Sequence, residues 1–355
     1  MERGTCVNTT DVLVVGGGPA GLSAALAVAK RGLTVVLADR QTRLGGQLIK
    51  QTHKFFGSRS QRAGHRGVEI ASDFESQILK QTGIEVLSQT EVLGYYPDGV
   101  VTMDQSGAWT KIRPQAIVVA TGASEKPLAF PNCDLPGVYG AGAVQTIMNL
   151  YGIMPGSRAL MVGAGNIGLI VSYQLTQAGV EVVAVVEAAP HIGGYAVHAS
   201  KIRRMGIPIL CSHVVKAALG NETLEKAVIW RVDQAWKGMP GTETEFAIDI
   251  LCLAVGLSPT TDLLWQMGCA MAFVPELGGH VPLLDAEQQT SVPGIFVAGD
   301  AAGAEEASSA MMTGRIAGLA VAKWLGKGGG VDQEISETRD QLAALRAGPT
   351  GEKVR

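Results

Sequence analysis

The same short pattern occurs twice in this chain of 355 residues. Asp11-Val-Leu-Val-Val-Gly-Gly-Gly-Pro-Ala-Gly21 and Ala159-Leu-Met-Val-Gly-Ala-Gly-Asn-Ile-Gly168 both run from an apolar strand into GxGxxG, and an Ala- and Leu-rich segment typical of a helix follows each. A strand, a glycine turn and a helix in this order open a βαβ unit that binds the phosphates of a dinucleotide. Two copies therefore predict two dinucleotide sites that face each other.

Composition supports a large α/β protein and narrows its partners. Hydrophobic residues make up 46% of the chain and charged residues 17%, enough apolar material for two domains. The net charge is −3, and no block of Lys or Arg is present, so we expect no nucleic acid and no anionic membrane surface as a partner. The polar first ten residues and the lack of a spanning apolar stretch predict a cytoplasmic protein without a membrane span.

The five cysteines are scattered and form no CxxC motif. This argues against a closely spaced redox disulfide, a zinc ribbon and an iron–sulfur loop within the chain. Cys211 and His213 would supply two metal ligands, but no second pair accompanies them. We therefore expect no metal site. The five cysteines are Cys6, Cys133, Cys211, Cys252 and Cys269.

The order of strands and glycine turns predicts two Rossmann-like domains with parallel sheets, the second inserted into the first. The Pro-rich segment 127–137 marks the hinge between them. We expect the first domain to comprise residues 10–126 and 276–326, and the second to comprise 127–275. The tail 327–355 is expected to carry an interaction helix or to be a frayed, solvated terminus.

In the first glycine turn each glycine has a separate task. Gly16 allows the tight turn, Gly18 lets the backbone approach a pyrophosphate, and Gly21 lets the helix pack on the strand. Asp39 ends the second strand, where a carboxylate accepts hydrogen bonds from ribose hydroxyls.

Three further segments resemble those of the two-dinucleotide-domain flavoproteins of the pyridine nucleotide–disulfide oxidoreductase type. Gly45-Gly-Gln47 is similar to the loop beside the flavin in that family, Ala120-Thr-Gly122 to its central crossover, and Gly294 to Asp300 to its second flavin signature. The resemblance implies that Asp300 binds a ribityl hydroxyl and that the following helix start faces the N1/C2 edge of the flavin and stabilises negative charge there. The FAD contacts expected in total are Gly16, Gly18, Pro19, Ala20, Gly21, Asp39, Arg40, Gly46, Gln47, Val92, Ala120, Thr121, Gly122, Gly299, Asp300, Glu306 and Ala307.

The second glycine turn also leads to a strand that ends in an acidic residue, Glu187. A carboxylate there favours a free ribose 2′-hydroxyl and repels a 2′-phosphate, so we expect NAD(H) rather than NADP(H). Lys201, Arg203 and Arg204 are a rival phosphate site or a solvated basic helix face, and a domain that binds nothing remains an alternative. The NAD contacts expected are Gly163, Gly165, Asn166, Ile167, Gly168, Glu187 and Gly256.

A closer resemblance is to the FAD/NAD subunits of hetero-oligomeric amine and imino-acid dehydrogenases, a group that includes sarcosine oxidase alpha, opine oxidase, hydroxyproline dehydrogenase and hydrogen cyanide synthase. Many members carry a cysteine-rich iron–sulfur segment, which this chain lacks, so the resemblance implies that any cluster lies on a partner subunit. Thioredoxin-reductase-like relatives carry a dithiol that is also missing here. The segments that carry the resemblance are 135–145, 151–156, 291–294 and 303–308.

For acid–base chemistry the flavin-side candidates are Gln47, Lys50 and His53, which follow the Gly-Gly loop. The alternative is that the basic residues lie on a surface loop or contact the FAD phosphates. Hydride transfer to flavin does not require a catalytic acid or base, so the sequence assigns none.

These observations lead to one functional hypothesis and two alternatives. The first is an FAD-dependent oxidoreductase subunit that exchanges a hydride between NAD(H) and flavin and passes electrons to or from a partner acting on a small amine or imino acid. The partners implied are a second flavoprotein and an iron–sulfur protein. The alternatives are a free-standing NADH-dependent reductase of a small electron-transfer protein, and an FAD-loaded assembly scaffold with a silent second site.

Overall fold

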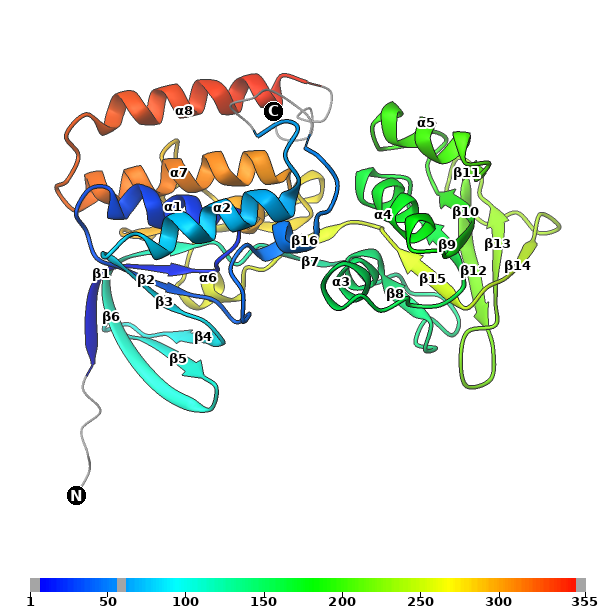
Figure 1. Ribbon diagram of the computed structural model, residues 1–355, viewed down its shortest axis with the longest axis horizontal. Coiled ribbons are helices and arrows are strands. Elements are labelled where there is room, and N and C mark those ends of the chain that lie inside the picture. Colours follow the sequence, from blue (N-terminus) through cyan, green and yellow to red (C-terminus); the bar gives the residue numbers. More distant parts are fainter. Residues whose placement is uncertain (1–6, 56–61, 349–355) are drawn as a thin grey trace. The chain divides into compact units, whose positions relative to one another are not determined.

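Figure 1 shows a computed structural model of the chain, which describes residues 7–55 and 62–348. The described residues form two units, one made of the segments up to Ser124 and from Ser258 onward, the other of Glu125–Leu257. The sequence pattern predicted the return to the first domain at residue 276, so the observed return comes earlier in the chain. Cys6 lies outside the described residues.

The first unit is built on a mainly parallel sheet with strand order β3-β2-β1-β6-β5-β4, and β19 pairs with β6. β1 lies between β2 and β6, and all three run in parallel; β4 and β5 extend the sheet in antiparallel fashion. The strands are β1 (Asn8–Val15), β2 (Val35–Ala38), β3 (Ile84–Leu87), β4 (Thr90–Tyr95), β5 (Val101–Gln105), β6 (Ala108–Val119) and β19 (Ile295–Val297).

Successive residues of the central strand point to opposite faces of this sheet and build two cores. Val12 and Val14 pack with helices on one face, while Leu13 and Val15 pack on the other. Figure 1 shows α1, α2 and α7 together, with α8 beyond α7. The helices are α1 (Pro19–Ala29), α2 (Gly67–Leu79), α7 (Ala307–Trp324) and α8 (Val331–Arg346).

The second core explains why the return to this unit comes so early. Leu264 and Cys269 are buried against Leu13 and Val119, so the segment that follows Ser258 belongs to the first sheet. This segment consists of α6 (Asp262–Gln266), β17 (Met271–Val274), the 3₁₀ turn η3 (Pro275–Leu277) and β18 (Gly279–Pro282).

The second unit contains a five-stranded parallel sheet with the order β11-β10-β9-β15-β8. Helices cover one face, and an antiparallel sheet of β12, β13 and β14 covers the other. The strands are β8 (Val138–Gly140), β9 (Arg158–Val162), β10 (Glu181–Glu187), β11 (Ile209–Cys211), β12 (His213–Leu219), β13 (Lys226–Arg231), β14 (Thr244–Ala247) and β15 (Ile250–Leu253). The helices are α3 (Ala141–Tyr151), α4 (Asn166–Gln177) and α5 (Ala196–Arg204).

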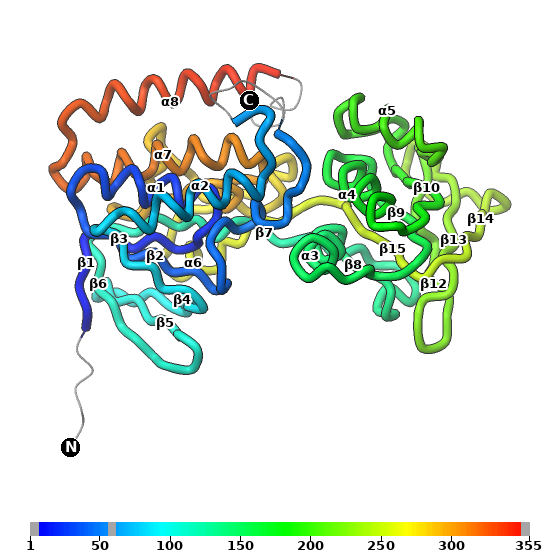
Figure 2. The backbone as a smooth tube through the Cα atoms, viewed as in Figure 1, coloured from blue at the N-terminus to red at the C-terminus, as the bar shows by residue number. Residues whose placement is uncertain are grey.

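The chain passes between the units in two short strands, β7 (Ala123–Glu125) and β16 (Leu257–Pro259), which pair with each other. Two 3₁₀ turns, η1 (Gly46–Lys50) and η4 (Gly299–Ala301), lie in the first unit. Figure 2 follows the backbone from α7 into α8, the last helix. Among the described residues no helix is both long enough and apolar enough to cross a membrane.

Candidate functional site

The first glycine turn joins β1 to α1 and leaves the start of the helix bare. Gly16 has φ +106°, and a Cβ on it would lie 2.3 Å from the carbonyl oxygen of Ala120, so only glycine fits. A Cβ on Gly18 would meet only the Cα of Gly46, at 3.9 Å. The N-cap residue of α1 makes no side-chain hydrogen bond. The turn is therefore an open anion site, and its geometry fits a pyrophosphate.

Asp39 is buried at the end of β2, directly beside this turn. Its carboxylate accepts hydrogen bonds from the backbone N–H groups of Gly17 (2.5 Å) and Gln41 (2.7 Å). A carboxylate held in this way keeps further lone pairs available, which fits the predicted ribose contact. Arg40, the next residue, is exposed.

The Gly45–Gly46 loop lies directly on the glycine turn. The N–H of Gly45 donates to the carbonyl of Gly17 at 2.8 Å. Gln47 is exposed in η1, and Lys50 ends this turn half-buried. The half-buried ring of His53 stacks on Phe55, with the ring centroids 6.0 Å apart. The structure thus brings Gly46 onto the turn and places Lys50 and His53 farther along the same segment.

The predicted second flavin motif, Gly294 to Asp300, contains β19 and the residues that follow it. The N–H of Gly299 donates to the buried Thr313 hydroxyl of α7 at 3.0 Å, and a Cβ on Gly299 would lie 2.7 Å from the Cβ of Ala20 on α1. The N–H of Glu305 donates to the Asp300 carboxylate at 3.3 Å. This motif therefore reaches the start of α1.

The remaining predicted FAD residues lie at two places in the first unit. Thr121 donates its hydroxyl proton to the Thr260 carbonyl at 2.7 Å, and the Gly122 carbonyl accepts from the N–H of Thr260 at 2.9 Å, so the crossover segment is fixed to the returning chain. Val92 lies on β4 and packs against the second core. Its role stays a prediction.

The second glycine turn repeats the geometry of the first. Gly163 has φ +104°, and a Cβ on it would lie 2.3 Å from the carbonyl oxygen of Ala254; a Cβ on Gly165 would meet nothing within 4 Å. The Glu187 carboxylate accepts from the N–H groups of Ala164 (2.7 Å) and Ala189 (3.0 Å). The start of α4 and an acidic strand end thus meet here as α1 and Asp39 do in the first unit.

The structure also places the other predicted residues of this second site. Ile167 is exposed on the first turn of α4, and the Asn166 side chain accepts a hydrogen bond from the N–H of Tyr195 at 2.8 Å. The carbonyl of Gly256 accepts from the N–H of Lys126 at 3.0 Å. Of the rival basic residues, Lys201 lies 5.2 Å from the centre of the Tyr173 ring.

Sequence reasoning missed a second Gly-Gly loop. The N–H of Gly194 donates to the carbonyl of Ala164 at 3.0 Å, which places Gly193–Gly194 on the second turn. In the first unit the corresponding bond comes from the first glycine of the pair, Gly45. Ile192-Gly-Gly-Tyr195 follows Glu187 at the same spacing as Leu44-Gly-Gly-Gln47 follows Asp39. Aligning the two halves of the chain would have revealed this loop.

Sequence reasoning also missed Glu125, at the start of the second unit. Its carboxylate accepts hydrogen bonds from the N–H groups of Gly142 (2.6 Å) and Ala143 (3.2 Å) at the N-terminus of α3. A Cβ on Gly140 would lie 2.2 Å from this carboxylate. The Gly-rich segment 135–145, noted above for its resemblance, thus makes room for an internal anion at this helix start.

The described cysteines are free, and three of them are held protonated at neutral pH. Burial raises the pKa of Cys252 to about 12, and it also raises the pKa of Cys269. Burial and then the Glu187 carboxylate raise the pKa of Cys211. Thiols in this state are weak nucleophiles. No group of three or more His, Cys, Asp or Glu residues suited to a metal ion occurs among the described residues.

Comparison with known proteins agrees with this geometry. A family model described as pyridine nucleotide-disulphide oxidoreductase matches residues 10–314. The chain is 28% identical to an opine oxidase subunit of Agrobacterium tumefaciens (strain Ach5), covering 87% of this chain and 65% of that protein. It is 29% identical to the alpha subunit of sarcosine oxidase from Corynebacterium sp. (strain P-1), covering 88% and 32%.

Among solved structures, a thioredoxin reductase of T. acidophilum has a similar fold, with a TM-score of 0.74 at 21% identity, covering 89% of this chain and 98% of that one. The chain spans about two thirds of the length of the opine oxidase relative, but only a third of the sarcosine oxidase relative. These findings confirm the fold class expected from the sequence and the expected classes of cofactor, FAD and a nicotinamide dinucleotide. The chain belongs to the pyridine nucleotide-disulphide oxidoreductase family, and it is an FAD-dependent oxidoreductase that uses FAD and NAD(P)H.

Proposed function

We propose that this chain is the FAD- and NAD(H)-binding subunit of a multi-subunit dehydrogenase acting on a small amine or imino acid. A hydride passes between NAD(H) and the flavin, and electrons pass to or from a partner subunit. The observation that carries the proposal is the pair of open glycine turns, each with an acidic residue fixed beside it by backbone N–H groups. Bound FAD would supply the hydride chemistry.

In the first unit, different residues would bind different parts of FAD. The start of α1 receives the pyrophosphate, Asp39 receives the ribose hydroxyls, and Asp300 receives a ribityl hydroxyl. The start of α7, at Glu306 and Ala307, places a helix N-terminus toward the ring, where it stabilises negative charge on the reduced form.

In the second unit the preference for NADH rests on Glu187. Both of its oxygens accept backbone hydrogen bonds, which fixes a negative charge where the 2′-phosphate of NADPH would have to lie. Lys201 lies over the Tyr173 ring, which favours its interpretation as part of a helix face over that of a phosphate ligand.

Partner subunits are supported by the relatives and by an exposed apolar segment. Both relatives described above are named as subunits. At the end of α3 and just after it, the residues Tyr151, Ile153 and Met154 are 70%, 58% and 55% exposed. Contiguous exposed apolar surface is a feature of protein interaction sites, so this segment is a candidate contact for a partner subunit.

The test is an anaerobic titration of the purified yellow protein with NADH, and separately with NADPH, followed by flavin absorbance. We expect NADH to bleach the flavin rapidly and NADPH to do so only at much higher concentration. No bleaching by either nucleotide would contradict the hydride path and favour the scaffold alternative. Fast turnover of the isolated chain with a ferredoxin would favour the free-standing reductase.

A further inference from the structure

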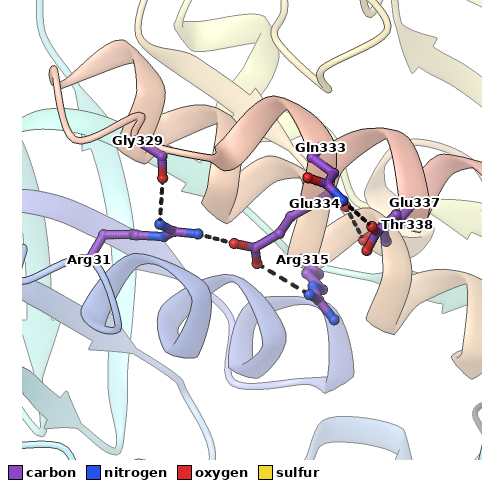
Figure 3. Close-up of polar contacts among 7 residues, drawn as sticks. All are labelled: Arg31, Arg315, Gly329, Gln333, Glu334, Glu337 and Thr338. Atoms are coloured by element: carbon purple, nitrogen blue, oxygen red, sulfur yellow. Dashed lines mark hydrogen bonds and ion pairs between the residues drawn. The ribbon is translucent and has the colours of Figure 1, made fainter.

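Helix α8 is attached to the first unit by buried side chains and by an ion pair at each end. The buried side chains are Val331, Ile335, Thr338 and Leu342. Near its start, Glu334 pairs with Arg31, in the turn that follows α1, and with Arg315 of α7, as Figure 3 shows. Near its end, Arg346 pairs with Glu305, the residue just before the N-cap of α7.

The Arg346–Glu305 pair is bidentate and largely shielded from solvent. The Nε of Arg346 donates to one carboxylate oxygen of Glu305 at 3.0 Å, and a terminal nitrogen donates to the other. The side chains are 28% and 13% exposed, respectively. Because two parallel charge-assisted bonds hold Glu305, loss of Arg346 would leave a poorly solvated carboxylate unpaired.

This pair lies on the loop that carries the second flavin motif. The N–H of Glu305 donates to the carboxylate of Asp300. Arg346 also lines a cavity of about 210 Å³ together with Gly299, Ala302 and Gly303. Gly299 is one of the expected FAD contacts, so this cavity adjoins the loop that carries the second flavin motif.

We propose that Arg346 is a positioning residue for the flavin site, contributed by the C-terminal helix. It fixes the segment between Asp300 and α7 and neutralises the Glu305 charge beside the helix start that faces the flavin. The inference rests on the proposed function only in placing the flavin ring near the start of α7. From the sequence, the tail was expected to be an interaction helix or a frayed terminus. The proposal instead gives the tail an influence on the charge around the flavin.

The two partners of the pair have opposite electrostatic effects, which gives a sharp test. In Arg346→Gln the carboxylate of Glu305 loses its counter-charge and disfavours the anionic reduced flavin, so the reduction potential falls. In Glu305→Gln the guanidinium of Arg346 remains and the potential rises. We expect the ratio of oxidised to reduced flavin to change about tenfold in each case, or about 30 mV for a two-electron couple. The double variant should return close to the parent value.

The potential is measured on FAD-loaded protein equilibrated with a reference dye and a chemical reductant, without NADH. The experiment is therefore independent of whether NADH reduces the flavin, and a failure of the hydride path does not affect it. FAD retention after gel filtration is recorded for each variant. Arg346→Lys keeps the positive charge, so its flavin reduction potential should stay close to that of the parent protein.

The matched control is Arg31→Gln, which loosens the other end of α8 at Glu334 and leaves the flavin loop untouched. We expect its potential to equal that of the parent protein. If Arg346→Gln loses FAD while Arg31→Gln retains it, positioning by Arg346 is supported. Shifts of the same sign in Arg346→Gln and Glu305→Gln, or an equal shift in Arg31→Gln, would overturn the proposal.

Discussion

Strands β19 and β8 hold equivalent positions in the two parallel sheets, and each leads into a helix. The N-termini of these two helices, α7 and α3, have different contacts. In the first unit β19 lies beside β6 and leads to α7; in the second unit β8 lies beside β15 and leads to α3. The start of α3 is closed by the Glu125 carboxylate. The N-cap residue of α7, Glu306, makes no side-chain capping bond to its helix.

This difference lies outside the glycine turns, which are nearly identical. Gly16 and Gly163 share the same φ within a few degrees, and each closely approaches the carbonyl of the residue that directly follows the neighbouring strand of its sheet. We therefore expect the turn to hold the phosphates in each unit. The start of α7 or of α3 should determine whether a second anionic group can be stabilised. A flavin whose ring gains negative charge needs that second helix start, and a nicotinamide, which carries positive charge when oxidised, does not.

The largest effects are expected from substitutions that add a side chain to the glycine turns at Gly16 and Gly163. Ala at Gly16 or Gly163 would place a Cβ 2.3 Å from a carbonyl oxygen at an unfavourable φ, which costs at least about 3 kcal/mol locally. We expect Gly16→Ala to be purified without flavin. Gly163→Ala should keep its flavin and lose bleaching by NADH.

The readouts for these two variants are flavin content per chain and the NADH titration. Gly179→Ala is a matched control, because Gly179 has φ +90° but open space around its Cβ position. This control shows how much of the effect comes from the unfavourable φ alone, without a clash at the expected phosphate site. Loss of flavin in Gly163→Ala would contradict the assignment of FAD to the first unit.

The next largest effects come from the acidic residues. Asp39→Ala should weaken FAD retention, and Glu187→Ala should raise the KM for NADH, because each loses charge-assisted ribose hydrogen bonds worth about 1.5–3 kcal/mol. Glu187→Ala should also narrow the preference for NADH over NADPH, since the repulsion of the 2′-phosphate disappears. The variants are compared by FAD dissociation and by steady-state kinetics with both nucleotides. An unchanged ratio of the two KM values in Glu187→Ala would contradict this account of selectivity.

The sequence predicted those parts of the site that are local in the chain. The turns at Gly16 and Gly163 and the acids at Asp39 and Glu187 each lie within one βαβ unit, where spacing alone relates a residue to its partner. Glu125 and α3 are separated by a Pro-rich loop, and Arg346 meets Glu305 only after α8 folds back along α7. Contacts of that kind depend on tertiary packing, which periodicity does not encode.

A smaller effect is expected at the closed helix start. Glu125→Ala removes two charge-assisted hydrogen bonds and uncovers the N–H groups of Gly142 and Ala143, which should destabilise the second unit by about 1–2 kcal/mol. Because the N–H groups at the start of α3 are then uncovered, added sulfate should bind there and restore part of the lost stability. The measurement is urea unfolding with and without sulfate, corrected for the effect of sulfate on the parent protein. An unchanged urea midpoint in Glu125→Ala would show that the Glu125 carboxylate does not stabilise the start of α3.

The smallest effect concerns the centre of the two sheets, where Cys252 occupies in β15 the position that Val118 occupies in β6. Burial raises the pKa of this thiol from 9.0 to about 12, so above pH 9 the unfolded chain loses a proton that the folded chain keeps. Deprotonation then favours the unfolded state, and stability falls by about 1.4 kcal/mol at pH 10. Cys252→Val makes the second sheet like the first. Its free energy of unfolding at pH 7.5, measured with urea, should equal that of the parent protein within about 1 kcal/mol, and the variant should lack this alkaline loss. If the difference between the variant and the parent protein is the same at both pH values, the Cys252 thiol does not contribute to the alkaline sensitivity of the second unit.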